Sequence, residues 1–379
     1  MIESLLAELR ERIGRPLEES VSMPRDVYVR EDFHEVEKAT IFSQGWHCVG
    51  RADEVAKAGQ YIAMGIADEP VFVLRGQDGV LRAFSNICKH RFAALVSGSG
   101  TIGQRLVCPY HAWSYDHSGH LVTVTNMPAG FDKSGCRLDE HHVCTWGGWV
   151  YVSLASAPPS LAEVLAPLTA LIGDYEPEKY ELLFTAEAVW ETNWKCLIEN
   201  FAEAYHVPIV HSRTIQPVTP HYLIRYEAGG EGFFRYVQVR ASDTAGSIFE
   251  GSEACSARLS ETMKTEIPII GVLPTQLISI SPQRTFWLCV QPDGVARTRI
   301  RWGVSVYPDK LSPEEREAYA ARSLASHEEI NGEDRAIIES IYRNARSLHA
   351  TGGRLSVMER SLWEFQQYVA RTVTASPAA

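Results

Sequence analysis

The spacing of hydrophobic and polar positions predicts helices at the start of the chain and strands after them. Apolar side chains recur at helical spacing within residues 2–13, and residues 30–42 show the same spacing with acidic residues first. After Trp46 the pattern changes to short runs rich in Val, Ile, Phe and Tyr, which glycine and aspartate interrupt. Such runs predict β-strands, and Asp78-Gly79 favours a hairpin turn between two of them.

A proline-rich break divides the chain at residues 155–160. This segment reads ASAPPS, and paired prolines continue neither a strand nor the interior of a helix. The later runs are 162–172 (helix), 182–192 (strand), 194–205 (helix), 225–241, 274–282, 285–294 and 297–308 (antiparallel strands) and 312–372 (helical). Strand runs followed by helix runs indicate the α+β class. We expect an all-β domain at 46–155 and an α+β domain at 156–379, with residues 1–45 helical and packed on the second domain.

Composition and charge exclude several classes of protein. The chain is 45% hydrophobic and 22% charged, which is typical of a globular protein and not of a disordered or coiled-coil one. Its net charge is −11, and we find no run dense in Lys and Arg, so we expect no nucleic-acid partner. The charged N-terminus and the absence of long apolar runs predict neither a signal peptide nor a membrane span. We therefore expect a cytoplasmic protein with reduced thiols, in which Cys–His clusters are candidate metal sites.

The first such cluster consists of two short loops. Cys88-Lys89-His90 is followed, after 17 further residues, by Cys108-Pro109-Tyr110-His111. Each loop offers one thiolate and one imidazole, which is the ligand set of a Rieske 2Fe–2S cluster, with two Cys on one iron and two His on the other. The same four ligands could hold a structural zinc, or they could be ordinary buried side chains.

The residues around the two loops resemble Rieske domains. The runs CKHR and CPYHAW, the glycine-rich connector, Tyr115 and Gly119-His120-Leu121 fit that family's pattern and favour the cluster over zinc. The connector also matches G-x-G-x-x-G, but it lies between two ligand loops instead of between a strand and a helix, so we interpret its glycines as turn residues. With no nucleotide-binding motif in the chain, the electrons are expected to come from a separate protein.

A second candidate metal site is Glu203-Ala-Tyr-His206-Val-Pro-Ile-Val-His211. Glu203 and His206 are three residues apart, which predicts that they share one face of a helix. Pro208 disfavours helical geometry at Val207, so the helix is expected to end there and the chain to turn, bringing His211 back beside His206. Two histidines and a carboxylate form the facial triad of non-haem Fe(II) oxygenases.

Together the two sites resemble the catalytic α subunit of Rieske non-haem iron oxygenases, the ring-hydroxylating family, over nearly the whole chain. Asn193-Trp194-Lys195 and Glu199-Asn200-Phe201 also belong to that pattern. The resemblance implies a helix-grip catalytic domain, in which helices cover an antiparallel sheet, with Asn200 as a candidate catalytic residue. It implies His206 and His211 as ligands of a mononuclear Fe(II). The third ligand would be Asp334, and its rivals on the same helix are Glu328, Glu329, Glu333 and Glu339.

The resemblance also implies partners and cofactors. In the family, the acidic residue at position 203 links a Rieske histidine of one subunit to an iron histidine of the next in a head-to-tail homotrimer. Here Glu203 would connect His111 with His206. O2 would be the co-substrate, and a ferredoxin or a flavin/iron-sulfur reductase would deliver two electrons, so that NAD(P)H and flavin act only through that partner. The commonest residue at position 203 is Asp, and the longer Glu resembles the group that acts on carnitine and related quaternary amines.

The sequence is compatible with three functions. The first is N-demethylation or hydroxylation of a quaternary amine or betaine, which aromatic side chains would bind through cation–π contacts. The second is hydroxylation of an aromatic or heteroaromatic ring, with Arg213 or Arg225 as candidates to bind an acid group. The third is electron transfer or zinc-stabilised binding without oxygenase activity. The candidate cage residues are Phe201, Tyr205, Tyr222, Phe233, Phe234 and Trp287.

Overall fold

The computed structural model describes residues 2–241, 254–309 and 311–375, and it divides into two compact units. One unit is Phe42–Leu161, and the other combines Met1–Ile41 with Ala162–Ala379. Within the described ranges, no helix combines the length and the apolar character that crossing a membrane requires. The helices are α1 (Ile2–Arg12), α2 (Asp26–Val29), α3 (Glu31–Glu37), α4 (Leu161–Val164), α5 (Ala166–Ile172), α6 (Trp194–Phe201), α7 (Val207–Val210), α8 (Pro313–Ala345) and α9 (Arg360–Thr374).

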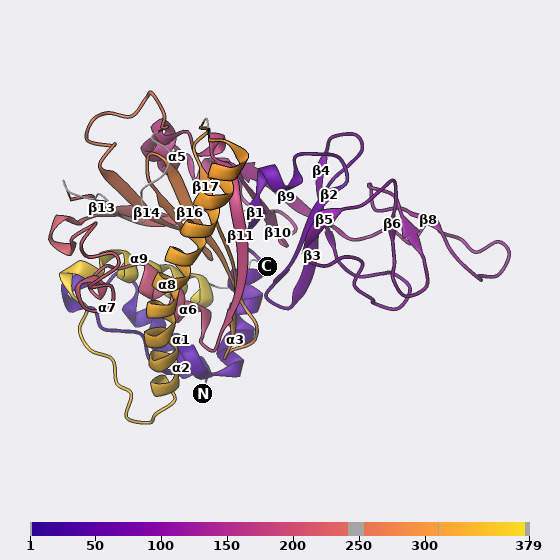
Figure 1. The fold of residues 1–379 in the computed structure, drawn as a ribbon. Helices are drawn as coiled ribbons and strands as arrows, with labels where there is room; N and C mark the ends of the chain where they lie inside the picture. The colour runs from indigo at the N-terminus through magenta and orange to yellow at the C-terminus, as the bar shows by residue number, and fades with distance from the viewer. Residues whose placement is uncertain (1, 242–253, 310, 376–379) are drawn as a thin grey trace. The chain divides into compact units, whose positions relative to one another are not determined.

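The unit Phe42–Leu161 is built from antiparallel strands. Its larger sheet has the order β1-β10-β9-β4-β3-β2-β5, and a small sheet has the order β6-β7-β8 (Figure 1). The larger sheet contains β1 (Trp46–Arg51), β2 (Gln60–Ile66), β3 (Glu69–Arg75), β4 (Leu81–Ser85), β5 (Ser99–Thr101), β9 (Glu140–Trp146) and β10 (Trp149–Ser153). The small sheet contains β6 (Leu106–Val107), β7 (Ser114–Tyr115) and β8 (Leu121–Thr123). Gly79, with φ of +78°, occupies the predicted turn between β3 and β4, a conformation that glycine adopts without strain.

The described residues of the second unit form one antiparallel sheet with helices against it. The strand order is β11-β17-β16-β15-β14-β13-β12, and every neighbouring pair is antiparallel. The strands are β11 (Glu181–Trp190), β12 (Arg225–Gly230), β13 (Phe233–Val239), β14 (Glu266–Val272), β15 (Gln276–Ile280), β16 (Arg284–Pro292) and β17 (Thr298–Val306). An all-β unit together with an antiparallel sheet covered by helices confirms the predicted α+β class.

Helix α8 runs along the sheet and contacts β11 (Figure 1). Its start follows from the sequence Ser312-Pro313-Glu314-Glu315. The Ser312 hydroxyl accepts a hydrogen bond from the Glu315 backbone, the Glu315 carboxylate accepts one from the Ser312 backbone, and Pro313 needs no partner in the first turn. This helix carries His327, Glu333 and Asp334 on the side of the sheet where the candidate site lies.

The N-terminal and C-terminal helices contact each other within the second unit. Gly14 donates a backbone hydrogen bond of 2.7 Å to the side chain of Gln367, and Gln367 donates one of 3.0 Å to the Arg12 carbonyl. The helix predicted at 30–42 is α3 followed by a π-helical turn, η2 (Lys38–Phe42). The 3-10 turns are η1 (Leu17–Glu19), η3 (Ala52–Val55), η4 (Gly173–Tyr175), η5 (Pro177–Lys179), η6 (His221–Leu223) and η7 (Val357–Glu359).

Candidate metal centres and the cavity beside them

The two Cys–His loops of the unit Phe42–Leu161 have the same backbone turn. In the first, the Phe92 N–H donates to the Cys88 carbonyl at 3.0 Å, and in the second the Ala112 N–H donates to the Cys108 carbonyl at 3.0 Å. Phe92 and Ala112 both have left-handed φ values, +62° and +57°. Non-glycine residues rarely adopt this conformation, and backbone strain of this kind often marks a functional site.

The candidate ligands of these loops form a thiol pair and an imidazole pair, and His90 stacks on Trp113, which belongs to the same buried cluster as the two cysteines. The Cys88 and Cys108 side chains are buried, while Nδ1 of His90 and Nδ1 of His111 are 3.1 Å apart near the surface. The Tyr115 hydroxyl lies 3.3 Å from Cys88 Sγ. Two paired thiols inside and two paired imidazoles outside match a cluster with Cys on one iron and His on the other. The residues present therefore fit a Rieske 2Fe–2S cluster.

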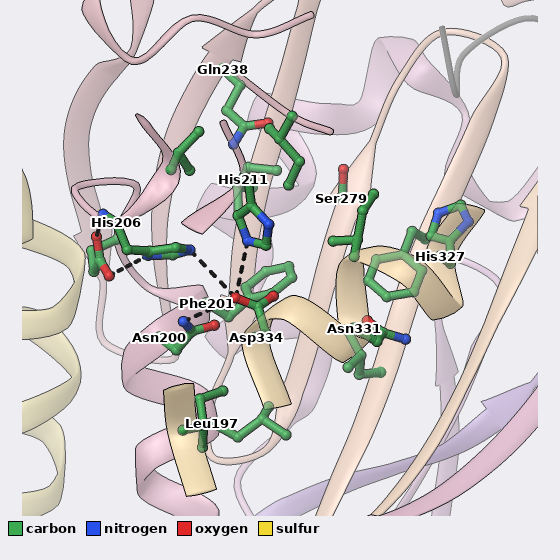
Figure 2. Close-up of a pocket in the computed structure, with 18 of the residues that line it drawn as sticks. Leu197, Asn200, Phe201, His206, His211, Gln238, Ser279, His327, Asn331 and Asp334 are labelled. Carbon is green, nitrogen blue, oxygen red and sulfur yellow. Dashed lines mark hydrogen bonds and ion pairs between the residues drawn. The ribbon is translucent and has the colours of Figure 1, made fainter. Parts of the chain in front are cut away.

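The second candidate centre consists of His206, His211 and Asp334. One ligand atom from each residue lies within 4.8 Å of the others. Asp334 Oδ1 is 3.0 Å from His211 Nε2 and 3.6 Å from His206 Nε2 (Figure 2). Two imidazoles and a carboxylate in this arrangement fit the facial triad of a mononuclear Fe(II).

The backbone that positions the histidines differs from the prediction. Helix α6 ends at Phe201, so the expectation that Glu203 and His206 share a helix is wrong. Instead His206 is the N-cap of α7, Pro208 lies in the first turn of that helix, and His211 is its C-cap. Proline lacks an N–H but suits a first helical turn, where N–H groups have no helical partner, so Pro208 begins a helix and does not end one.

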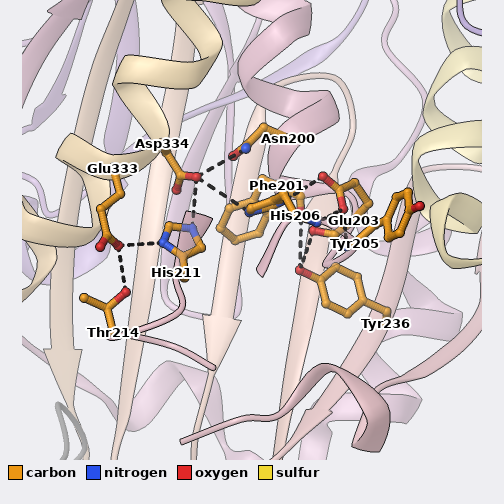
Figure 3. Close-up of polar contacts among 10 residues, drawn as sticks. All are labelled: Asn200, Phe201, Glu203, Tyr205, His206, His211, Thr214, Tyr236, Glu333 and Asp334. Carbon is orange, nitrogen blue, oxygen red and sulfur yellow. Dashed lines mark hydrogen bonds and ion pairs between the residues drawn. The ribbon is translucent and has the colours of Figure 1, made fainter. Parts of the chain in front are cut away.

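Each histidine is oriented by its own carboxylate. Glu203 Oε1 is 2.5 Å from His206 Nδ1, and Glu333 Oε2 is 2.7 Å from His211 Nδ1 (Figure 3). The carboxylates accept the Nδ1 proton, which leaves Nε2 of each ring as the atom that faces Asp334. Glu333 was a rival for the third metal ligand in the sequence, and the structure places it behind His211 instead.

Further hydrogen bonds hold these carboxylates in place. Thr214 donates to Glu333 Oε2 at 2.7 Å, and Asn200 donates its amide to Asp334 Oδ1 at 3.2 Å. Glu203 also accepts hydrogen bonds from the backbone N–H groups of Tyr205 and His206. Asn200 thus contacts a candidate metal ligand, and Glu203 contacts another. The contact of Glu203 with a partner subunit stays a prediction.

The charges around His211 agree with a metal site. Burial alone would lower the pKa of His211, but hydrogen bonds and charge interactions with Asp334 and Glu333 outweigh burial and raise it. The carboxylates therefore favour a positive charge at this position. A metal cation supplies such a charge by displacing the proton, as metal binding to histidine requires.

The triad lines a cavity of about 120 Å³ between α6, α8 and the sheet. Much of its wall is apolar, and the aromatic residues in the wall are Trp190, Phe201, Tyr236 and Phe286. Of the cage residues suggested by the sequence, Phe201 lies in this wall. Tyr205 and Tyr222 are exposed on the surface, while Phe233, Phe234 and Trp287 are buried outside the lining.

The cavity wall contains an arginine that was not predicted from the sequence. Arg213 and Arg225 lie outside the lining, whereas Arg284 is part of it. Arg284 begins the strand Arg284–Pro292, in which Phe286 and Leu288 also line the cavity. The sequence does contain a signal for this position. Arg284 alternates with apolar residues of the same strand, and side chains two residues apart on a strand share a face, so the three are expected to face the same side.

Comparisons with known proteins agree with the two units. Residues 173–375 match the family model of the ring hydroxylating alpha subunit (catalytic domain), and residues 45–154 match that of the Rieske [2Fe-2S] domain. The glycine betaine monooxygenase oxygenase subunit of Pseudomonas aeruginosa is 35% identical over 194 residues, which are 51% of this chain and 45% of that protein. The carnitine monooxygenase oxygenase subunit of Escherichia coli is 32% identical over 198 residues, 51% of this chain and 53% of that protein. Each of these matches therefore covers only about half of the relative.

The fold is similar to that of a solved quaternary ammonium Rieske monooxygenase. The two structures have a TM-score of 0.80 and 21% sequence identity, and the match covers 94% of this chain and 96% of that one. At this level of identity the similarity concerns the fold alone.

Proposed function

The chain belongs to the ring-hydroxylating alpha-subunit family of Rieske oxygenases, and from this membership we propose that it is a terminal oxygenase that hydroxylates or N-demethylates a quaternary amine or betaine. The observation that carries the proposal is the position of His206, His211 and Asp334 in the wall of a partly aromatic cavity. Aromatic rings favour a quaternary ammonium group through cation–π attraction, and the nearby carboxylates add negative charge.

The relatives support the same substrate class. The proteins matched over half of this chain carry names that refer to glycine betaine and carnitine, both of which are quaternary amines. Glu203, in place of the commoner Asp, agrees with that group. The aromatic ring hydroxylases of the family form the alternative, and the product of the reaction distinguishes the two.

When bound, the mononuclear iron would supply oxygen activation and the 2Fe–2S cluster would supply electrons that a ferredoxin or flavin/iron-sulfur reductase delivers. The chain's own residues prepare the site for this chemistry. Glu203 and Glu333 hold the Nδ1 protons of the two histidines, which leaves the Nε2 atoms free to bind the metal. Asn200 holds Asp334 in orientation, and the apolar wall limits the entry of water.

The proposed reaction balances with O2, two electrons and two protons. One oxygen atom replaces the hydrogen of a C–H bond with a hydroxyl group, and the other leaves as water. If the carbon is an N-methyl group, the resulting carbinolamine breaks its C–N bond and releases formaldehyde and a tertiary amine. Hydroxylation of the chain carbon bonded to the nitrogen breaks a C–N bond in the same way and releases an aldehyde and a tertiary amine. On a carbon that is not bonded to nitrogen the product is a stable alcohol.

The electron path of the proposal crosses between subunits. Glu203 would join the His111 of a partner subunit's cluster to His206 in a homotrimer. Within this chain, Glu203 contacts His206 through its Oε1 atom, which is one half of that path. The similar solved structure is described in connection with inter-subunit electron transfer, a property of that protein that supports the same arrangement here.

Product analysis tests the proposal. The cluster-loaded protein is combined with a reductase and labelled O2, and offered glycine betaine, carnitine, γ-butyrobetaine and aromatic acids. Formaldehyde or a larger aldehyde together with the matching tertiary amine, or a labelled alcohol of the amine, supports the proposal. A labelled phenol or diol from an aromatic acid, with the amines unchanged, contradicts it. Oxygen uptake is no substitute for product analysis, because uncoupled turnover also consumes O2.

A further inference from the structure

The cavity contains a buried cation as well as the candidate metal triad. Arg284 lines the cavity, and only 4% of its surface is exposed. Arginine keeps its charge even where burial lowers its pKa, as burial does for Arg284. A permanent positive charge is therefore present in a cavity whose other charged groups, Glu203 and Asp334, are carboxylates.

The turn between β15 and β16 fixes the position of Arg284. Its backbone N–H donates to the Ser281 hydroxyl at 3.2 Å, and its carbonyl accepts hydrogen bonds from the Ser281 backbone at 2.8 Å and hydroxyl at 3.0 Å. Ser281 also lines the cavity, as does Ser279, which pairs with Phe286 across the two strands. Polar side chains thus accompany Arg284 on this part of the wall.

Arg284 lies toward His327, at a distance from the metal triad. Burial, followed by the charge of Arg284, lowers the pKa of His327 to about 3, which indicates that the two residues are neighbours. The His327 ring also lies 4.7 Å, between centroids, from Phe286, two residues after Arg284. His327 precedes Asp334 by seven residues on α8, which at 1.5 Å per residue separates them by roughly 10 Å along the helix axis. Figure 2 shows His327 and Ser279 on the opposite side of the cavity from His206.

We propose that Arg284 binds a carboxylate of the substrate and so holds the molecule with its other end at His206, His211 and Asp334. This inference depends on the proposed function in one respect, namely which carbon atom of the substrate is oxidised. A guanidinium group has five N–H donors in a planar fork that matches a carboxylate, and Tyr319 also hydrogen-bonds with this one. The Ser279 hydroxyl can add a hydrogen bond to the same carboxylate.

The separation of the two ends also indicates the length of the substrate. A molecule that reaches from Arg284 to the triad needs several bonds between its carboxylate and the carbon to be oxidised. γ-Butyrobetaine has three methylene groups between its nitrogen and its carboxylate, whereas glycine betaine has one. The longer molecule is therefore expected to bind more tightly, because it can contact both ends of the cavity at once.

Calorimetric titration of the cluster- and iron-loaded protein, without reductase, tests the proposal apart from turnover. The probes are γ-butyrobetaine and its methyl ester. The ester lacks the negative charge of the acid and carries one additional methyl group. The protein is expected to bind the acid at least about tenfold more tightly than the ester, the usual effect of a charged hydrogen-bonded pair. Equal binding of acid and ester would overturn the proposal. This comparison needs no variant and so is independent of any folding defect.

Two substitutions then assign the effect to Arg284. Arg284→Gln removes the charge and should abolish the preference for the acid, while Arg284→Lys keeps the charge and should retain part of it. The control is Arg301→Gln, which removes an arginine that is also buried, 7% exposed, but lies on the neighbouring strand outside the cavity lining. It should leave the preference unchanged. A full preference in Arg284→Gln would overturn the assignment.

A second pair of probes separates this inference from the proposed function. If neither γ-butyrobetaine nor its ester binds, benzoate and benzamide are titrated in the same way. Tighter binding of benzoate that depends on Arg284 would support the carboxylate site while contradicting the quaternary-amine substrate. If neither pair shows an Arg284-dependent preference for the acid, the carboxylate site is wrong.

Discussion

Glu333 accepts a hydrogen bond of 2.7 Å from Nδ1 of His211, the ring atom opposite the one that faces the metal position. The next residue, Asp334, lies 3.0 Å from Nε2 of the same ring. Successive residues on a helix point about 100° apart, so two neighbouring acids on α8 reach opposite sides of one imidazole. One acid is thus available as a ligand, and the other fixes the orientation of a ligand.

We expect Glu333→Gln to weaken iron binding at the mononuclear site by about 10- to 100-fold and leave the 2Fe–2S cluster intact. The reason is that a carboxylate behind a histidine ligand fixes the ring and increases its basicity, and its loss typically has an effect of this size. The measurement is the affinity of the cluster-loaded protein for added Fe(II). Glu329→Gln, at an exposed position of the same helix, is the control and should bind iron as the unmodified protein does. Unchanged affinity in Glu333→Gln would show that Thr214 and packing alone orient His211.

We expect His206→Ala to lower the iron content from about three to about two atoms per chain, because it removes a ligand of the single iron and none of the cluster. The visible spectrum of the cluster should stay unchanged while product formation is lost. His221→Ala provides the control, since that histidine belongs to the same unit and contacts Gln216 instead of the triad. Turnover that survived in His206→Ala would place the mononuclear site elsewhere.

Local spacing in the sequence locates part of the site. Each Cys–His loop carries its two donors within a few residues of each other, so the local motif is sufficient to find them. In the structure the two histidines lie together, and His90 stacks on Trp113 in the buried cluster that contains Cys88 and Cys108. Asp334 required resemblance, because several acids on one helix are equivalent until it is known which face meets the cavity. The roles of Glu333 and Arg284 depend on that packing as well, and neither role was predicted from the sequence.

The strands were also predicted only in part. The runs at 285–294 and 297–308 alternate clearly and correspond to β16 and β17. Strand β14 was not predicted, because Pro268 interrupts it and proline normally argues against an interior strand. The helix predicted through Tyr205 ends earlier, at Phe201, since Pro208 starts a separate turn. Proline favours the first turn of a helix but disrupts a helix interior, and the conformation of the neighbouring backbone decides which case applies.

We expect Glu199 to make the protein less stable as the pH rises from 5 to 8. Burial, offset in part by hydrogen bonds from Tyr28 and Gln366 and by the charge of Lys195, raises the pKa of Glu199 to about 7 in the folded chain, and Glu359 raises it further. The unfolded chain releases the proton near pH 4.5, so the folded state binds more protons between these values. The resulting stabilisation is complete below about pH 4.5 and is lost as the pH rises through 7.

Glu199→Gln should remove this dependence. The difference in unfolding free energy between the unmodified protein and the variant is expected to change by up to about 3 kcal/mol between pH 5 and pH 8, measured by urea denaturation. Glu317→Gln, at an exposed position of α8, is the control and should show no such change. A parallel pH dependence in Glu199→Gln and the unmodified protein would mean that another group is responsible.

We expect the protein to be destabilised when one partner of the buried ion pair between Glu37 and Lys195 is removed. Lys195 Nζ is 2.5 Å from Glu37 Oε1, both side chains are fully buried, and the pair joins α3 to α6, the helix that carries Asn200. Lys195→Met leaves the Glu37 charge buried and without its lysine, with the Trp194 indole at 3.2 Å and the His34 ring at 3.4 Å as remaining contacts, and should cost about 3–5 kcal/mol of unfolding free energy.

The double variant Glu37→Gln with Lys195→Met separates the cost of the unpaired charge from the value of the pair. It removes both charges and should recover most of the loss, because a buried pair often contributes little beyond what apolar packing supplies. The control is Lys179→Met, which removes the lysine of a half-exposed pair with Glu176 of similar length, 2.7 Å, and should cost less than about 1 kcal/mol. If the double variant were as unstable as Lys195→Met, the loss would come from the shape of the lysine side chain and its contacts with Phe33 and Trp194, and not from the charge of Glu37.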